Sequence, residues 1–203
     1  MKSNFTINEK ATYDVAGIGS ALLDFTIHVN DNDLQSLGLN KGEMRLIDED
    51  QSKDILKAIA HLEMETTPGG SSANTLAGVA NFSGKAVFQG KVGDDQHGEL
   101  YISETEKVGV ETKISKDGHL SGHAITFITP DSERSFATHL GAALHFNKDD
   151  VHEESIKRSK ILHFEGYLFE PPTLREACFK ALKIAKENNI LVSLDLSDPA
   201  LIG

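Results

Sequence analysis

The sequence has few of the features of secreted or membrane-spanning proteins. Cys178 is the only cysteine among 203 residues, so no disulfide can form within the chain. No apolar run approaches the roughly 20 residues of a transmembrane helix. The N-terminal stretch MKSNFTINEKATYD also lacks the apolar core of a secretory signal. These absences exclude a disulfide scaffold and predict a cytoplasmic protein with no membrane partner.

Basic residues are in the minority. The chain has 20 Lys and Arg against 31 Asp and Glu, which gives a formal net charge of -11 at pH 7. Nucleic acids require clustered basic side chains, so this composition argues against a nucleic-acid partner. A bound polyanion would depend on a local site of backbone N–H groups and a few cations, because the field of the whole protein is negative.

Several common catalytic motifs are missing. The chain contains no G-x-x-x-x-G-K-[ST] phosphate loop and no G-x-S-x-G nucleophile elbow. The segment GIGSAL lacks the third glycine of a dinucleotide fingerprint. The nine histidines show no H-E-x-x-H spacing and there is no cysteine pair, so the sequence predicts no zinc site.

Strand-like and helix-like segments alternate along most of the chain. YDVAGIGSALLDFTIHV is typical of two strands around a glycine turn, and KAVFQGKVG, KILHFEG and ILVSLDLS are typical of further strands. Helices are expected in DEDQSKDILKAIAHLE, after a Ser71 or Ser72 cap, between Asp95 and Gly109, and from Pro172 to Asn188. This alternation predicts an α/β fold with a doubly wound, mostly parallel sheet.

Two regions interrupt the alternation. The segments at about 25–47 and 110–130 are rich in turns and β-formers, with turns expected at 116–118 and 131–133. They predict a small second β-sheet attached to the main one.

Glycines and small polar residues follow the predicted strands. AGIGSALLD places Asp24 shortly after the first strand, and PGGSSAN places Gly69, Gly70 and Asn74 at the start of a helix. Ligands of parallel sheets bind beyond the carboxyl ends of the strands, and glycine allows a ligand to approach the backbone. Carboxylate and amide groups match vicinal hydroxyls, so the pattern favours a polyol. The alternatives are structural: Asp24 capping a turn, and Asn74 as an ordinary first-turn residue.

The order of these motifs carries a family resemblance. GIGSALLD, GGSSANTLAGVANFSGKAVFQGKVGDDQHG and ERSFATHLGAA follow one another as in the ribokinase/adenosine kinase family, also called the PfkB sugar kinases, which the chain resembles over nearly its whole length. FEGYLFEPP and LDLSDP look most like the adenosine-kinase-like bacterial branch.

The resemblance implies a ribokinase-like α/β core with a β-sheet lid, and phosphorylation by ATP and Mg²⁺ of the hydroxymethyl group of a sugar or nucleoside, with a nucleoside favoured. Asp24, Asn74 and the Gly69–Gly70 backbone would hold the sugar hydroxyls. Arg134 would stabilise the transferring phosphate, although a surface salt bridge is the alternative role for this residue. Glu165 and Asp198 would lie near the sugar and, through water, the metal.

One family feature is missing. Relatives carry their catalytic aspartate in a C-terminal GAGD loop, and no such motif occurs here. Residues 1–203 are therefore expected to be the N-terminal, substrate-binding portion of a kinase. The alternatives are a sugar- or nucleoside-binding module without catalysis, and a homodimer formed through the lid.

Overall fold

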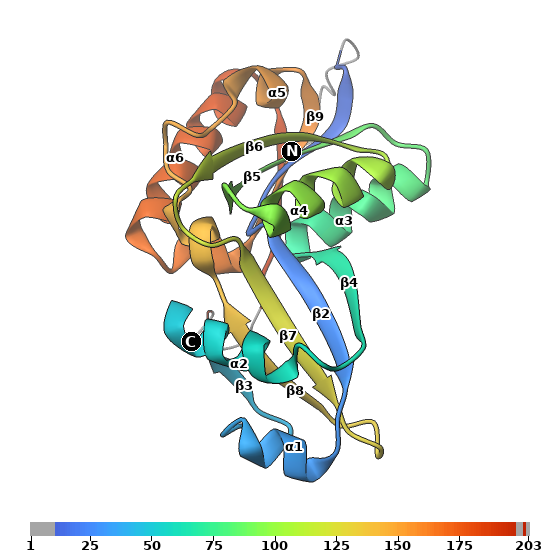
Figure 1. Cartoon of the computed structure of the whole chain (residues 1–203). Coiled ribbons are helices and arrows are strands. Elements are labelled where there is room, and N and C mark those ends of the chain that lie inside the picture. Colours follow the sequence, from blue (N-terminus) through green and yellow to red (C-terminus); the bar gives the residue numbers. More distant parts are fainter. Residues whose placement is uncertain (1–10, 198–200, 202–203) are drawn as a thin grey trace.

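The structure, a computed structural model, describes residues 11–197 and 201. It contains two five-stranded β-sheets that meet at a narrow waist (Figure 1). In the first sheet every neighbouring pair is parallel. Its strands in spatial order are β10 (Leu191–Asp195), β9 (Ser159–Glu165), β1 (Tyr13–Ile18), β5 (Ala86–Gly93) and β6 (Val110–Asp117). The predicted α/β fold with a parallel sheet is confirmed.

Helices cover both faces of the first sheet because its strands are apolar on both sides. Strand β5 is buried along its whole length. One face packs against α3 (Ser71–Asn81) and α4 (Gln96–Lys107), where Phe88 meets Leu76 and Tyr101 in one core cluster. The other packs against α5 (Glu153–Lys157) and α6 (Pro172–Glu187), whose apolar stripe contains the buried Cys178.

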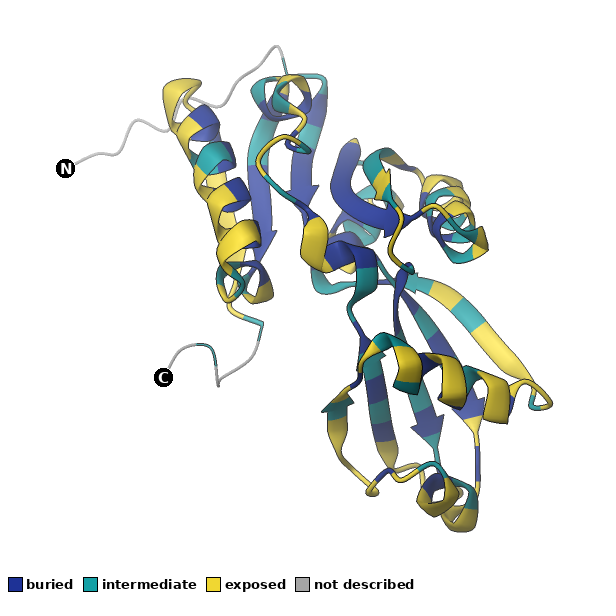
Figure 2. Cartoon of the chain, turned by 60° about the vertical axis from the view of Figure 1, so that its left-hand side comes forward, coloured by how far each residue is buried: buried dark blue, intermediate teal, exposed yellow. Residues whose placement is uncertain are grey.

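The second sheet is mixed. Its strands in spatial order are β3 (Met44–Leu46), β8 (Arg134–His139), β7 (Gly122–Ile128), β2 (Leu22–His28) and β4 (Met64–Gly69). Alternate residues of β2 (Leu23, Phe25 and Ile27) are at most 1% exposed. They pack into the core with α1 (Asp31–Ser36) and α2 (Glu49–Ile59), which lies across this face (Figure 2). The opposite face, which contains Asp24 and Thr26, is only partly buried.

The second sheet differs in extent from the predicted lid segments. Residues 110–117 form β6 of the first sheet, because they pair along their whole length with β5. Residues 64–69 and 134–139 belong to the second sheet, although both ranges lie outside the predicted lid segments. The segment METTPG shows no apolar alternation and contains a proline, which edge strands such as β4 tolerate.

Two local details also differ. Residues 31–36 form a helix, not a strand, because Asn30 and Asp33 make a reciprocal capping box at its start. The predicted serine cap of α3 is wrong: the N-cap is Gly70, with no side-chain cap. Among the described helices, none is long and apolar enough to cross a membrane.

Candidate active site

A cleft lies where the half-buried face of the second sheet meets the carboxyl ends of the first sheet's strands. A cavity of about 390 Å³ has Ser20, Gly70, Ser71 and Glu165 on one side, and Leu22, Leu46 and Ala124 on the other. A groove of about 300 Å³ continues from Ala124 along the second sheet. The groove is lined by Asp24, Thr26, Thr67, Ala124, Thr126, Ile128, Arg134 and Phe136.

Asp24 is an unusual acid for the middle of a β-strand. It lies in β2, paired with Thr67 on one side and Ala124 on the other, and its side chain is half-buried in the groove. Within the described chain no group donates a hydrogen bond to its carboxylate, and burial raises its pKa. The turn-capping role is wrong, because Asp24 lies within a strand. A partly desolvated carboxylate without a partner is suited to accept hydrogen bonds from a ligand.

Gly69 and Gly70 shape the backbone beside Asp24. A Cβ atom at Gly69 would lie 2.2 Å from Asp24 Oδ2, and one at Gly70 would lie 2.3 Å from the Ser20 carbonyl oxygen. Gly70 also has φ of 95°, a conformation that other residues rarely adopt. The buried Tyr101 hydroxyl donates to the Gly69 carbonyl at 3.1 Å, which fixes the turn in place.

The substitution Gly69→Ala is expected to displace the Asp24 carboxylate, because the new methyl group would overlap it. Loss of one hydrogen bond to a charged group predicts about 10- to 100-fold weaker binding, in calorimetry, of any ligand that donates to this carboxylate. The overlap should also cost about 1–3 kcal/mol of unfolding free energy. Gly78→Ala in α3 is the matched control, because a Cβ there meets nothing within 4 Å. Equal affinities of the two variants would contradict the assigned geometry.

Glu165 joins two segments of the same wall of the cleft. It ends β9 and is 1% exposed. Its Oε1 accepts from Ser20 N at 2.8 Å and its Oε2 accepts from Ser72 N at 2.9 Å. Burial raises its pKa, although these hydrogen bonds oppose the shift. Glu165 therefore joins the β1–β2 turn to the first turn of α3.

Comparison with known protein families matches residues 42–202 to the pfkB family carbohydrate kinases. The chain belongs to this family. Among curated members, it is 30% identical over 197 residues to the 5-dehydro-2-deoxygluconokinase of Bacillus subtilis, covering 95% of this chain and 53% of that protein. It is 37% identical over 133 residues to the enzyme of that name from Halalkalibacterium halodurans, covering 63% of this chain and 40% of that protein.

A solved pfkB-type structure gives the same fold. The adenosine kinase from Sinorhizobium meliloti is 35% identical, with a TM-score of 0.81 over 95% of this chain and 59% of that protein. The predicted ribokinase-like fold is confirmed. The chain spans about half the length of the relatives it matches.

The pfkB fold brings only some of the predicted residues together. Arg134 lines the groove with Asp24, but the strand register places it level with His28, four residues along β2. That spacing is about 13 Å. Arg134 is exposed and makes no ion pair with any described residue, so the salt-bridge alternative finds no support. Asn74 is exposed on α3 and does not line the cavity or the groove. Asp198 lies outside the described residues.

The structure places Asp195 beside this pfkB cleft, bonded to the lining residue Ser71, although Asp195 itself lines neither the cavity nor the groove. It ends β10, and its Oδ2 accepts a 2.5 Å hydrogen bond from the Ser71 hydroxyl, which lowers its pKa. Sequence reasoning chose Asp198 from the same LDLSDP segment. The position of Asp195 directly at the carboxyl end of a core strand was the available signal.

Proposed function

We propose that this chain forms the substrate-binding part of an ATP-dependent kinase that phosphorylates the hydroxymethyl group of a sugar or nucleoside. The observation that supports it best is Asp24, a half-buried carboxylate in the groove that accepts no hydrogen bond within the described chain. Two adjacent hydroxyl groups of a sugar would satisfy both of its oxygens. Membership of the pfkB family supports the same reaction class.

The walls around Asp24 suit a sugar ring. Gly69 and Gly70 leave room for it where any side chain would overlap Asp24 or Ser20. Asn74 would add a hydroxyl contact from α3 if α3 and the second sheet close around the ligand. In this closure the second sheet would act as a lid over the ligand.

Arg134 would act at the phosphate. Among the described residues that line the cavity and the groove, it is the only cation. It therefore fits one transferring phosphoryl group, whereas the described residues offer too few cations for a whole triphosphate. ATP would supply the phosphoryl group, and Mg²⁺ would neutralise charge on the phosphates.

A nucleoside is the favoured substrate. The strands of the second sheet contain three phenylalanines: Phe25 and Phe127 are buried in the core, while Phe136 lines the groove with Asp24 and could stack on a purine. The adenosine kinase relative supports this choice, whereas the names of the curated relatives favour a sugar acid.

Calorimetry on the purified chain tests the proposal. We expect adenosine to bind and D-ribose to bind more weakly, because ribose offers the hydroxyls without the ring for Phe136. Tighter binding of 5-dehydro-2-deoxygluconate than of adenosine would overturn the nucleoside preference. No binding of any of the three by a folded sample would refute the substrate site.

A second candidate is a sugar- or nucleoside-binding module without catalysis, because the groove around Asp24 and the Gly69–Gly70 turn would serve binding alone. Phosphoryl transfer from ATP by the protein that contains this chain would exclude it.

A homodimer through the second sheet stays a prediction. The edge strands of this sheet are β3 and β4, and Met44 and Leu46 on β3 are exposed. Light scattering distinguishes monomer from dimer.

A further inference from the structure

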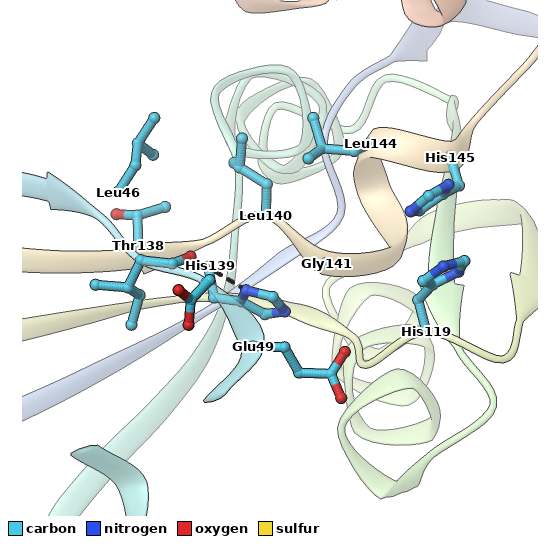
Figure 3. Close-up of a pocket in the computed structure, with 11 residues that line it drawn as sticks. Leu46, Glu49, His119, Thr138, His139, Leu140, Gly141, Leu144 and His145 are labelled. Atoms are coloured by element: carbon cyan, nitrogen blue, oxygen red, sulfur yellow. Dashed lines mark hydrogen bonds between the residues drawn. The ribbon is translucent and has the colours of Figure 1, made fainter. Parts of the chain in front are cut away.

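Three potential metal ligands converge at the end of β6, on the sheet edge opposite β10. Asp117 is the last residue of β6, His119 follows in the loop to β7, and His145 ends the 3-10 helix η1 (Gly141–His145). One ligand atom of each residue lies within 4.8 Å of the others. The two imidazole rings stack at a centroid distance of 3.7 Å and an interplanar angle of 10°. Figure 3 shows them side by side although they come from separate segments.

The backbone that presents these side chains is fixed by other contacts. His119 N donates to Asp117 Oδ1 at 2.9 Å, and Ala142 N donates to the Leu120 carbonyl at 2.8 Å. These bonds join the β6–β7 loop to β6 and to η1.

The end of η1 is fixed as well. The ammonium of Lys91, which is only 7% exposed, donates to the His145 carbonyl at 3.0 Å and pairs with Asp150 at 2.8 Å. A ligand set whose backbone is already ordered loses little entropy when it binds an ion.

The chemistry of the three groups selects the kind of ion. Two imidazoles and a carboxylate suit zinc and its neighbours, whereas magnesium and calcium prefer oxygen ligands alone. Asp117 Oδ1 lies 3.1 Å from His119 Nδ1. A carboxylate oxygen and an imidazole nitrogen of the proposed ligand set are therefore already adjacent.

The cluster borders a cavity whose lining is mostly apolar but includes several titratable side chains. His119 and His145 line a space of about 330 Å³ together with Glu49 and His139 (Figure 3). His139 is 8% exposed, and its Nε2 has no hydrogen-bond partner within the described structure. This cavity shares Leu46, Thr138, Leu140 and Leu144 with the substrate cavity. A metal here would keep its remaining coordination positions for water from the cavity.

We propose that Asp117, His119 and His145 bind one zinc-class divalent cation, which ties the β6–β7 loop to η1. Sequence analysis predicted no zinc site, because His145 is separated from the other two ligands by the β7–β8 hairpin. The site is distinct from the substrate groove, and its existence does not depend on the kinase reaction.

Calorimetric titration of the tag-free, metal-stripped chain with ZnCl₂ tests the site. We expect one equivalent of zinc to bind. MgCl₂ at 5 mM, roughly the excess needed to compete at a weak oxygen site, should not displace the zinc. His119→Ala and His145→Ala should each lower the zinc affinity by about 10- to 100-fold or more. Mutation of a residue that only hydrogen-bonds to a metal ligand already lowers metal affinity by this factor. His61→Ala, an exposed histidine after α2, is the matched control and should bind as the parent does.

A second readout uses Co²⁺ in place of zinc. The parent and His61→Ala should give the visible absorption of a low-coordinate cobalt site, and the two cluster variants should lose it. All three altered histidines are exposed or at the surface of the cavity, and circular dichroism would check that each variant is folded. No stoichiometric binding to the parent, or equal affinity in His119→Ala, His145→Ala and His61→Ala, would overturn the proposal.

Discussion

In the proposed kinase, the substitution Asp24→Asn is expected to lower kcat/KM by about 10²- to 10⁴-fold. Each hydrogen bond between a sugar hydroxyl and the carboxylate is worth about 1.5–3 kcal/mol, and two such bonds would be weakened or lost. The fold should not suffer, because no described group donates a hydrogen bond to Asp24. Steady-state kinetics and calorimetry on the same samples measure both effects.

The pH dependence gives an independent check on Asp24. Burial raises its pKa above the usual value for aspartate. Substrate affinity should therefore weaken as the pH falls through this raised pKa, and Asp24→Asn should lack that change. Stability has the opposite sign: the folded state holds the proton more tightly, so ionisation of Asp24 costs stability as the pH rises from the unfolded to the folded pKa. Above that range the variant should be at least as stable as the parent.

Two outcomes would contradict the role of Asp24. Unchanged affinity in a folded Asp24→Asn sample would place the substrate elsewhere. A variant that unfolds would show that Asp24 has a structural partner. Asp54→Asn, the same chemical change at an exposed position of α2 outside the cavity and the groove, is the matched control and should bind as the parent does.

The substitution Glu165→Ala is expected to lower the free energy of unfolding by about 2–4 kcal/mol. It removes the acceptor of two N–H groups, at Ser20 and Ser72, and each buried donor left unpaired costs about 1–3 kcal/mol. Urea denaturation followed by circular dichroism measures the loss. The effect is large because the two groups belong to separate segments, the β1–β2 turn and α3, which this one carboxylate joins.

Glu165→Gln separates the positioning role from simple loss of volume. The amide has one acceptor oxygen, so it can keep one of the two hydrogen bonds and should lose less stability than alanine does. It also removes a carboxylate whose pKa burial has raised, which offsets part of the cost. Equal stability of the alanine variant and the parent would show that water replaces the carboxylate. A fall in affinity without a fall in stability would instead assign Glu165 to the substrate.

Much of the fold could be predicted because its strands and helices have strong local patterns. Strand β5 is a short apolar run between turn residues, and α6 repeats small and apolar residues at helical spacing after Pro172. Strand β4 could not be predicted, because METTPG has neither pattern and is held by pairing with β2. The assignment of 110–117 to the main sheet also depends on a distant partner, β5.

The candidate site shows the same limit. Asp24 and the Gly69–Gly70 turn could be proposed because each lies in a short glycine-containing motif, GIGSALLD and PGGSSAN. Two other features could not be predicted, because they depend on how distant segments pack together. Both carboxylate oxygens of Glu165 accept hydrogen bonds, and Arg134 lies four strand positions from Asp24. Asp195 was missed because its partner, Ser71, is 124 residues away along the chain.

The chain crosses between the two sheets four times, and all four crossings lie in one row. Leu22, where β2 begins, is paired with Gly69, where β4 ends, and with Gly122, where β7 begins. His139, where β8 ends, is paired with His123. Neighbouring strands are about 4.8 Å apart, so the row is about 14 Å wide. Four linkers in a line define a hinge axis. They resist twisting and translation of one sheet relative to the other. Rotation about this axis is therefore the relative movement that they resist least.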